Sequence, residues 1–220
     1  SGQYFENVSP ITGGVIGDDL KCDDSSTVEI SGGIIGNRFK LQNNTSALIT
    51  GGTIGSQFNL EGQSEAIVTG GAIGDRCTVL QGSRLTVSGG TIGDRFNLLS
   101  GTLELVMRSL QIDGDPVQIA LGERITIDDR GVALDGVLAD GTPIRFFLNA
   151  DLGLAELDFF NPTATVTVVG AIAAPCGAAD LAEPFETLDL DDIAQFVGAF
   201  LSQSPSADLN RDGFIDLADI

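Results

Sequence analysis

The sequence Gly-Gly-Val-Ile-Gly at residues 13–17 recurs as Gly-Gly-Ile-Ile-Gly at 32–36, Gly-Gly-Thr-Ile-Gly at 51–55, Gly-Gly-Ala-Ile-Gly at 70–74 and Gly-Gly-Thr-Ile-Gly at 89–93. Consecutive copies are 19 residues apart, which indicates a repeat protein built from one structural unit. We number the positions of the repeat from the first glycine of each copy, so that isoleucine occupies position 4 throughout.

Apolar residues recur at four further positions of the repeat. Positions 8 and 10 hold Leu20, Phe39, Phe58, Cys77 and Phe96, and then Cys22, Leu41, Leu60, Val79 and Leu98. Positions 16 and 18 hold Val28, Ala47, Ala66 and Leu85, and then Ile30, Ile49, Val68 and Val87. Apolar residues spaced by two have the period of a β-strand and not that of a helix. The repeat therefore predicts an all-β fold, a parallel β-solenoid of 19-residue coils, with the glycines of positions 1, 2 and 5 at its corners.

Polar residues form columns between the apolar ones. Hydroxyl residues at positions 14 and 19 are Ser26, Thr45, Ser64, Ser83 and Thr102, and then Ser31, Thr50, Thr69 and Ser88. We expect them to form hydrogen bonds from coil to coil. Positions 6 and 7 hold Asp18, Asn37, Ser56, Asp75 and Asp94, and then Asp19, Arg38, Gln57, Arg76 and Arg95. This face is either a solvated corner that avoids like-charge stacking or a surface that binds a ligand.

The 19-residue period ends after Gly101, and strand patterns with turn signals follow. The turn signals are Asp113-Gly114, Asp135-Gly136 and Asp140-Gly141. A hairpin is expected over Val132–Leu148 and a further strand over Thr163–Val169. Because the end of a solenoid is an open hydrogen-bonding edge, we expect residues 1–102 to form the solenoid and residues 103–170 to cap it.

Residues 171–177 are mostly small and suit a linker, after which the composition changes. Residues 178–220 contain ten acidic residues and one basic residue, Arg211. The segment Asp208–Asp219 has the ligand spacing of a twelve-residue calcium loop, with its turn at Gly213. The expected oxygen ligands are Asp208, Asn210, Asp212, the carbonyl group of Phe214, Asp216 and, as a bidentate carboxylate, Asp219. The sequence therefore predicts a calcium site in this tail.

The calcium loop ends in Asp, as dockerin loops do, whereas an EF-hand loop normally ends in Glu, so the tail resembles a dockerin repeat pair. The related first segment, Asp180–Ile193, has Pro184 and Phe185 in place of a ligand and the glycine, and we expect it to hold no metal. The residues between the loops have the spacing of one amphipathic helix, as in dockerins. They are Ile193, Phe196, Val197, Phe200 and Leu201. The second helix of such a module is expected to follow Ile220, so we expect either that the natural protein continues there or that it ends in an incomplete module.

The Gly-Gly-x-Ile-Gly repeats, the capping segment and the Pro-Cys-Gly sequence at 175–177 are together similar to surface proteins of planctomycete-like bacteria that carry a so-called GC-type dockerin. This resemblance implies an extracellular or cell-surface location and a cohesin-like partner for the tail.

The amino-acid composition disfavours several classes of binding partner and activity. The 31 acidic and 11 basic residues give a formal net charge of −20, which repels nucleic acid and anionic lipid surfaces. The chain has no His, no Trp and one Tyr, so the commonest general base and the usual sugar-stacking groups are scarce, and we expect no enzymatic activity. No apolar run reaches the roughly 18 residues that a membrane helix needs. A start at Ser1 rather than Met is expected of a chain that is either signal-cleaved or trimmed, and we expect export.

Other repeat types fit less well. RTX calcium repeats share the Gly pair and an acid at position 6, but need a glycine where this repeat has isoleucine. The outward residues are too irregular for an ice-binding ladder, and the coils are too short and too few for a polysaccharide lyase. Cys22 and Cys77 lie three coils apart, about 14 Å at roughly 4.8 Å per coil, so we expect buried free thiols. Cys176 is a candidate to pair with a cysteine beyond Ile220.

These observations favour a structural or adhesive surface protein. Only Ser1–Thr12 precede the first Gly pair, so we expect an uncovered edge there and head-to-tail self-association into a filament. Anchoring through the tail is the other expected mode. The alternative function is a carbohydrate-binding solenoid that uses the Asp and Arg columns.

Overall fold

The computed structural model describes residues 4–5, 10–80, 82–151, 157–171 and 190–201. The chain divides into two compact units, residues 1–171 and residues 172–220. The described strands lie in the first unit, and the described helix lies in the second.

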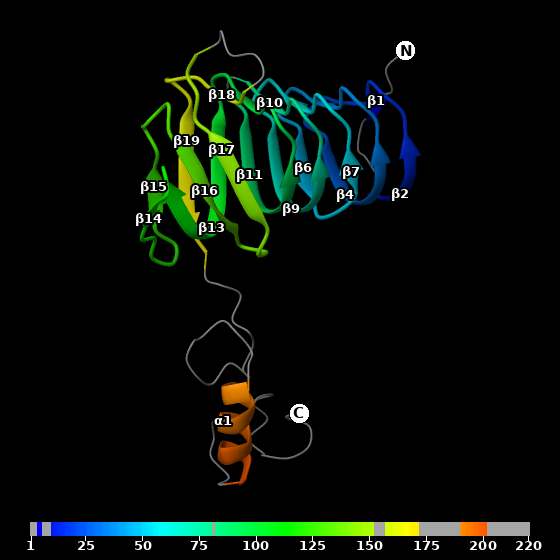
Figure 1. Cartoon of the computed structure of the whole chain (residues 1–220). Helices are drawn as coiled ribbons and strands as arrows, with labels where there is room; N and C mark the ends of the chain where they lie inside the picture. Colours follow the sequence, from blue (N-terminus) through cyan, green and yellow to red (C-terminus); the bar gives the residue numbers. More distant parts are fainter. Residues whose placement is uncertain (1–3, 6–9, 81, 152–156, 172–189, 202–220) are drawn as a thin grey trace. The chain divides into compact units, whose positions relative to one another are not determined.

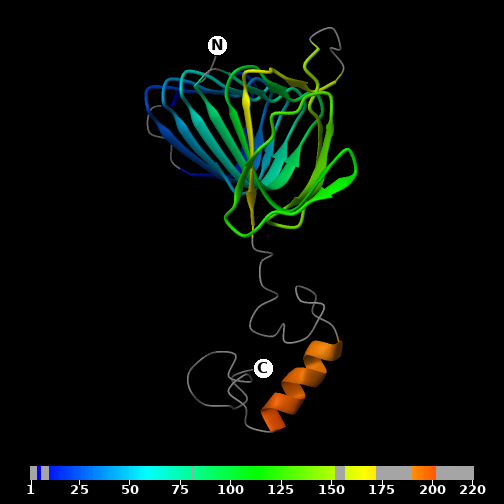
Figure 2. The ribbon, with the colours of Figure 1, turned by 90° about the vertical axis from the view of Figure 1, so that its left-hand side faces the viewer.

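The first unit is a parallel β-solenoid of about five turns, as the repeat predicts (Figure 1). Short strands form one sheet in the order β1 (Tyr4–Phe5), β3 (Lys21–Cys22), β5 (Lys40–Leu41), β8 (Asn59–Leu60), β10 (Thr78–Val79), β12 (Asn97–Leu98) and β18 (Phe159–Phe160). Longer strands form the other parallel ladder through β2 (Ile11–Ile16), β4 (Thr27–Ile35), β6 (Ser46–Ile49) with β7 (Thr53–Ile54), β9 (Glu65–Ile73), β11 (Arg84–Ile92), β13 (Thr102–Ile112) and β19 (Thr165–Gly170). Figure 2, viewed from the side of β15 and β19, shows the coils stacked one behind another.

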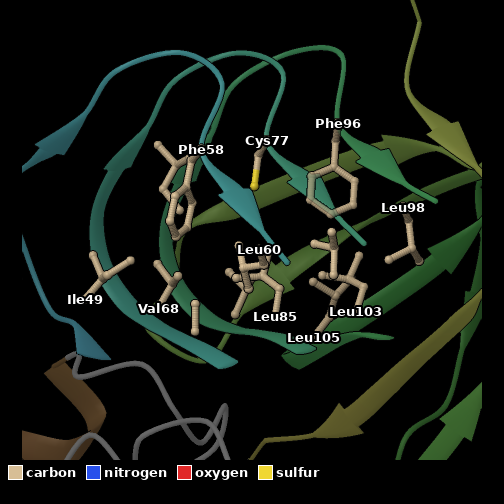
Figure 3. Close-up of a cluster of buried hydrophobic side chains, with 14 of the residues drawn as sticks. Ile49, Phe58, Leu60, Val68, Cys77, Leu85, Phe96, Leu98, Leu103 and Leu105 are labelled. Carbon is tan, nitrogen blue, oxygen red and sulfur yellow. The ribbon is translucent and has the colours of Figure 1, made fainter. Parts of the chain in front are cut away.

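The core lies between the two sheets and contains the predicted apolar columns, together with residues of the segment after Gly101 such as Leu105 and Phe146. In the position 4 column Ile35, Ile54 and Ile73 are buried, whereas Ile16 and Ile92 at its two ends are half-buried. Every residue at positions 8, 10, 16 and 18, from Leu20 to Leu98, is buried. The rings of Phe39 and Phe58 stack with their centroids 5.0 Å apart. Cys77 follows them in the same column, between Phe58 and Phe96 (Figure 3). Cys22 and Cys77 are free and buried, which confirms that these two thiols act as small apolar residues.

The glycine pair differs from its expected place at a corner. In β4, β9 and β11 the pair lies inside one continuous strand, and the pairing register shifts around it as in a β-bulge. The second glycine of each pair has a positive φ, for example +86° at Gly71. A Cβ atom on Gly71 would lie 2.8 Å from the carbonyl carbon of Gly51 in the preceding coil. The pair is therefore required by a bulge and by the close approach of neighbouring coils.

The solenoid continues past the last Gly pair with a shorter coil. Thr102 pairs with Arg84, so this coil has 18 residues and Gly101 takes the place of Ser83. The expected hydroxyl ladder is therefore wrong in including Thr102. Strand β13 starts at Thr102, so the expected start of the cap at residue 103 falls within a solenoid strand. β19 then adds to β13 in parallel.

The segment between β13 and β18 is an insertion that covers the end of the core. It contains β14 (Asp115–Val117), β15 (Arg124–Thr126), β16 (Ala133–Leu138) and β17 (Pro143–Phe147). β16 and β17 form the predicted hairpin, and β16 runs antiparallel to β13. The expected turn at Asp135-Gly136 is wrong, because both residues lie inside β16. A side chain at Gly136 would overlap the carbonyl oxygen of Ser109, so glycine permits close packing there instead of a turn.

The cap is fastened to the coils by two carboxylates. Asp140 Oδ2, in the hairpin turn, accepts a hydrogen bond from the backbone N–H of Gly90 at 2.9 Å. Burial works to raise the pKa of Asp140, but hydrogen bonds from Thr142 and Gly90 outweigh it and lower the pKa. Asp158 Oδ1 accepts from the N–H of Phe96 at 2.8 Å, and burial raises the pKa of Asp158.

In the second unit, α1 spans Leu190–Leu201, so the predicted helix is present. The rings of Phe196 and Phe200 contact each other with centroids 5.8 Å apart, one turn apart on the helix. Val197 and Leu201 are exposed. None of the described helical residues forms a helix long and apolar enough to cross a membrane.

Candidate functional site

The predicted calcium ligands lie outside the described residues. They are Asp208, Asn210, Asp212, Phe214, Asp216 and Asp219, and Cys176 also lies outside. Within the described part of the chain, no group of three or more Cys, Asp or Glu side chains has the arrangement of a metal site. The site analysis therefore concerns the solenoid surface and its ends.

Asp and Asn residues of the position 6 column link their coil to the next through side-chain oxygens, whereas no such bond is found for Ser56 among the described residues. Asp18 Oδ1 accepts a hydrogen bond from the backbone N–H of Asn37 at 2.8 Å. Asn37 Oδ1 accepts from the N–H of Ser56 at 2.9 Å, and Asp75 Oδ1 accepts from the N–H of Asp94 at 3.2 Å. These oxygens satisfy backbone donors at a corner where no strand ladder does so. This column is therefore structural.

The hydroxyl column at position 14 is buried but forms no uniform ladder. Ser26 Oγ and Thr45 Oγ1 are 3.5 Å apart, and Thr45 also donates to the carbonyl group of Gln42 in its own coil. Ser64 Oγ donates to the carbonyl group of Leu41 in the preceding coil at 3.1 Å. Ser83 Oγ has no hydrogen-bond partner among the described residues. The expected coil-to-coil bonding thus holds for part of this column.

The position 7 column has an unusual backbone conformation. Asp19, Arg38, Gln57, Arg76 and Arg95 all have φ between 61° and 66°, in the left-handed region. Arg38 donates two hydrogen bonds to the carboxylate of Asp19, at 2.6 and 2.8 Å. The hydrogen bond from Arg38 lowers the pKa of Asp19, and the same contact raises the pKa of Arg38. The backbone conformation at position 7 is thus repeated in every coil.

Positions 7 and 9 together line a shallow groove of about 370 Å³ on the short-strand sheet. Its lining residues are Arg38, Lys40, Gln57, Asn59, Arg76, Thr78 and Asn97. Three are basic, four are neutral and hydrogen-bonding, and none is acidic. In a chain with net charge −20, such a lining forms a local surface that favours anions and hydroxyl groups.

The position 9 residues were not singled out from the sequence. Lys21, Lys40, Asn59, Thr78 and Asn97 are each the first residue of a two-residue strand. Alternation predicts that the residue before a buried position 10 residue points outward. That signal would have identified position 9 as outward-facing, but not the groove that it forms with position 7.

The two ends of the long-strand sheet differ from its interior. β2 is the last strand at one end, and no strand of the described chain pairs with its outer edge. Val15 of β2 is 77% exposed, and no described atom lies within 4 Å of a Cβ atom built on Gly13, Gly14 or Gly17. At the other end, β15 pairs with β19 and is the last strand of its sheet.

The chain matches no protein-family model, no curated protein and no solved structure. The functional argument therefore depends on the geometry of the solenoid itself.

Proposed function

We propose that this protein is a non-catalytic, extracellular structural or adhesive protein of the cell surface. The observation that supports this proposal is the regular stacking of the coils, in which buried apolar columns and side-chain bonds to backbone groups commit most of each repeat to the rod. Such a surface is a spacer or a display platform, because its polar groups serve coil-to-coil contacts.

We propose that the rods associate end to end, with β2 of one subunit pairing with β15 at the end of the next. Two sheet-end strands support this arrangement. In the fourth coil Ala72, the equivalent of Val15, donates its N–H to the carbonyl group of Gly52 in the preceding coil at 2.9 Å. The N–H of Val15 is therefore oriented toward the outer edge of β2. Identical head-to-tail contacts propagate into filaments instead of closing.

Val15→Pro tests the assembly, because proline removes this outward N–H. Val15→Thr is the matched control, since threonine occupies the same repeat position at Thr53 and Thr91 and keeps the N–H. Electron microscopy and sedimentation should show filaments for the unmodified chain and for Val15→Thr, and folded monomers for Val15→Pro. If the unmodified chain stays monomeric at high concentration with calcium present, the filament proposal is wrong. The remaining proposal is then a single rod that is anchored through its tail.

The tail is the proposed anchor. We propose that Asp208–Asp219 binds calcium and that the dockerin-like module docks to a cohesin-like protein. The support is the ligand spacing in the sequence and the helix α1. Pull-down with an immobilised cohesin, with and without calcium, tests the docking.

A second candidate function is carbohydrate binding, and the groove on the short-strand sheet favours it. The groove presents amide, hydroxyl and cationic groups side by side along the rod. A saccharide-array screen of the purified chain tests this candidate, and binding to no saccharide would exclude it.

A further inference from the structure

We propose that the groove binds an extended anionic polysaccharide that lies along the solenoid axis, with its acidic groups on Arg76, Lys40 and Arg38. The inference rests on the second candidate function, carbohydrate binding, and is independent of end-to-end assembly. It assigns both the chemical class of the ligand and its direction on the rod.

The charges of the groove point to an anion. Lys40 has one carboxylate near its Nζ atom, Glu61 Oε1 at 3.4 Å, and Arg38 is paired with both Asp19, at 2.6 Å, and Asp18, at 3.7 Å. No carboxylate of the described residues forms an ion pair with Arg76, whose side chain is exposed within the groove. Arg76 is therefore the cation with the most capacity left for a ligand. A guanidinium group binds a carboxylate or sulfate through two parallel N–H donors.

The spacing along the rod points to a linear, periodic ligand. Arg38 and Arg76 occupy the same repeat position two coils apart, about 9.5 Å at roughly 4.8 Å per strand. Gln57 stands between them in the same column, with Asn59 beside it. Cations thus alternate with an amide along the axis. This order suits a chain in which charged groups alternate with hydroxyl groups.

The groove is pre-organised for such a ligand. The position 7 residues share one left-handed backbone conformation, with φ of 61° at Arg38 and Arg76 and 66° at Gln57. Each is fixed by coil stacking, as in the bond from the N–H of Arg38 to the carbonyl group of Ser56 at 2.9 Å. Less backbone freedom is therefore lost when a ligand binds.

The same groove is poorly suited to a peptide. Peptides usually bind through an open strand edge, through apolar pockets or, when acidic, through clusters of Arg side chains. Of the two Arg residues in the groove, Arg38 is already paired with Asp19. The groove lies across the face of paired strands, so the backbone groups of β5, β8 and β10 are already committed to the sheet. None of its lining side chains is aromatic or aliphatic. A polyhydroxylated anion fits this lining better than an acidic peptide.

Neighbouring coils supply substitutions that preserve the fold. Arg76→Gln copies the residue that already adopts this conformation at Gln57, and Gln57→Arg copies Arg76. Arg145→Gln is the control, because Arg145 lies in β17, is exposed and is not part of the groove. It produces the same change in net charge as Arg76→Gln.

The experiment titrates the full chain, in the presence of a calcium chelator, with a short oligogalacturonate, its fully methyl-esterified form and an oligoglutamate. We expect the oligogalacturonate to bind and its neutral ester to bind several-fold more weakly. Arg76→Gln should weaken binding by about two- to five-fold, the range of an exposed ion pair, Gln57→Arg should strengthen it, and Arg145→Gln should leave it unchanged.

Three results would overturn the inference, and they differ in whether they also exclude carbohydrate binding. Equal binding of acid and ester, unaffected by Arg76→Gln, would leave carbohydrate binding standing and exclude the ionic contact. Binding of neither saccharide, together with a blank saccharide array, would exclude the carbohydrate function as well. Equally tight binding of oligoglutamate would identify a general site for anions or acidic peptides.

Discussion

Asp18 and Gly36 are coupled across neighbouring coils. The Oδ1 atom of Asp18 accepts a hydrogen bond from the backbone N–H of Asn37 at 2.8 Å. The same oxygen atom occupies the space that a Cβ atom on Gly36 would need. The same relation joins Asp75 to Gly93, and Asn37 to Gly55. The glycine at position 5 thus leaves room for the acid or amide at position 6 of the preceding coil. At Gly74, whose preceding coil has Ser56 at position 6, it is the backbone of Gly55 that a Cβ atom would approach, at 2.9 Å.

Gly36→Ala should therefore destabilise the solenoid by about 1–3 kcal/mol, the usual cost of overpacking. A Cβ atom there would also lie 2.7 Å from the carbonyl carbon of Gly17. Gly17→Ala is the matched control, because no described atom lies within 4 Å of the corresponding position. Thermal unfolding should show a lower Tm for Gly36→Ala only. Equal effects of the two substitutions would contradict the coupling.

Ile54→Asp should unfold the solenoid. Ile54 is 1% exposed in the position 4 column, and an unpaired charge there costs several kcal/mol. Its neighbour Thr53 faces solvent, so Thr53→Asp should leave the melting temperature nearly unchanged. Circular dichroism melts of both variants check this, and a stable Ile54→Asp protein would refute the stacking register.

Calcium should order the tail without affecting the solenoid, because residues 208–219 carry the complete ligand set in the sequence. Chelation and Asp212→Ala should produce the same change in the NMR signals of the tail. The melting temperature of the solenoid should be the same with and without calcium. A solenoid that melts in chelator would indicate RTX-type calcium binding in the repeats.

Stability should fall in alkaline solution because of the buried thiols. Burial raises the pKa of Cys22 from 9.0 to about 11 and that of Cys77 to about 12. Between about pH 9 and about pH 11 the unfolded chain loses thiol protons that the folded chain keeps, so the free energy of unfolding falls as pH rises. The full contribution of the thiols is present below pH 9.

The variant Cys22→Leu with Cys77→Leu is the control for this pH dependence. Leucine already occupies position 10 at Leu41 and position 8 at Leu20, so both columns accept it. Melting temperatures measured across this pH range should decline less steeply in the variant. An identical decline would show that other groups, such as lysines, cause the alkaline loss.

The 19-residue period by itself determined the solenoid, its apolar columns and the burial of both described cysteines. These follow from sequence because stacked identical coils place equal repeat positions in one column, and apolar columns must face inward. The helix α1 follows from its 3.6-residue apolar spacing in the same way.

The tertiary structure alone decided which polar columns are structural and where the coils end. The oxygens of Asp18 and Asn37 at position 6 reach backbone N–H groups of the next coil, a relation that needs the distance between coils as well as the residue types. The pairing of Thr102 with Arg84, which makes that coil one residue shorter, likewise depends on contacts between distant segments. So does the place of Gly136 within β16. The groove exists because two outward columns, at positions 7 and 9, lie side by side on the short-strand sheet. Their adjacency is a property of the folded backbone, since local sequence patterns specify the face of each strand but not the gap between side chains on it.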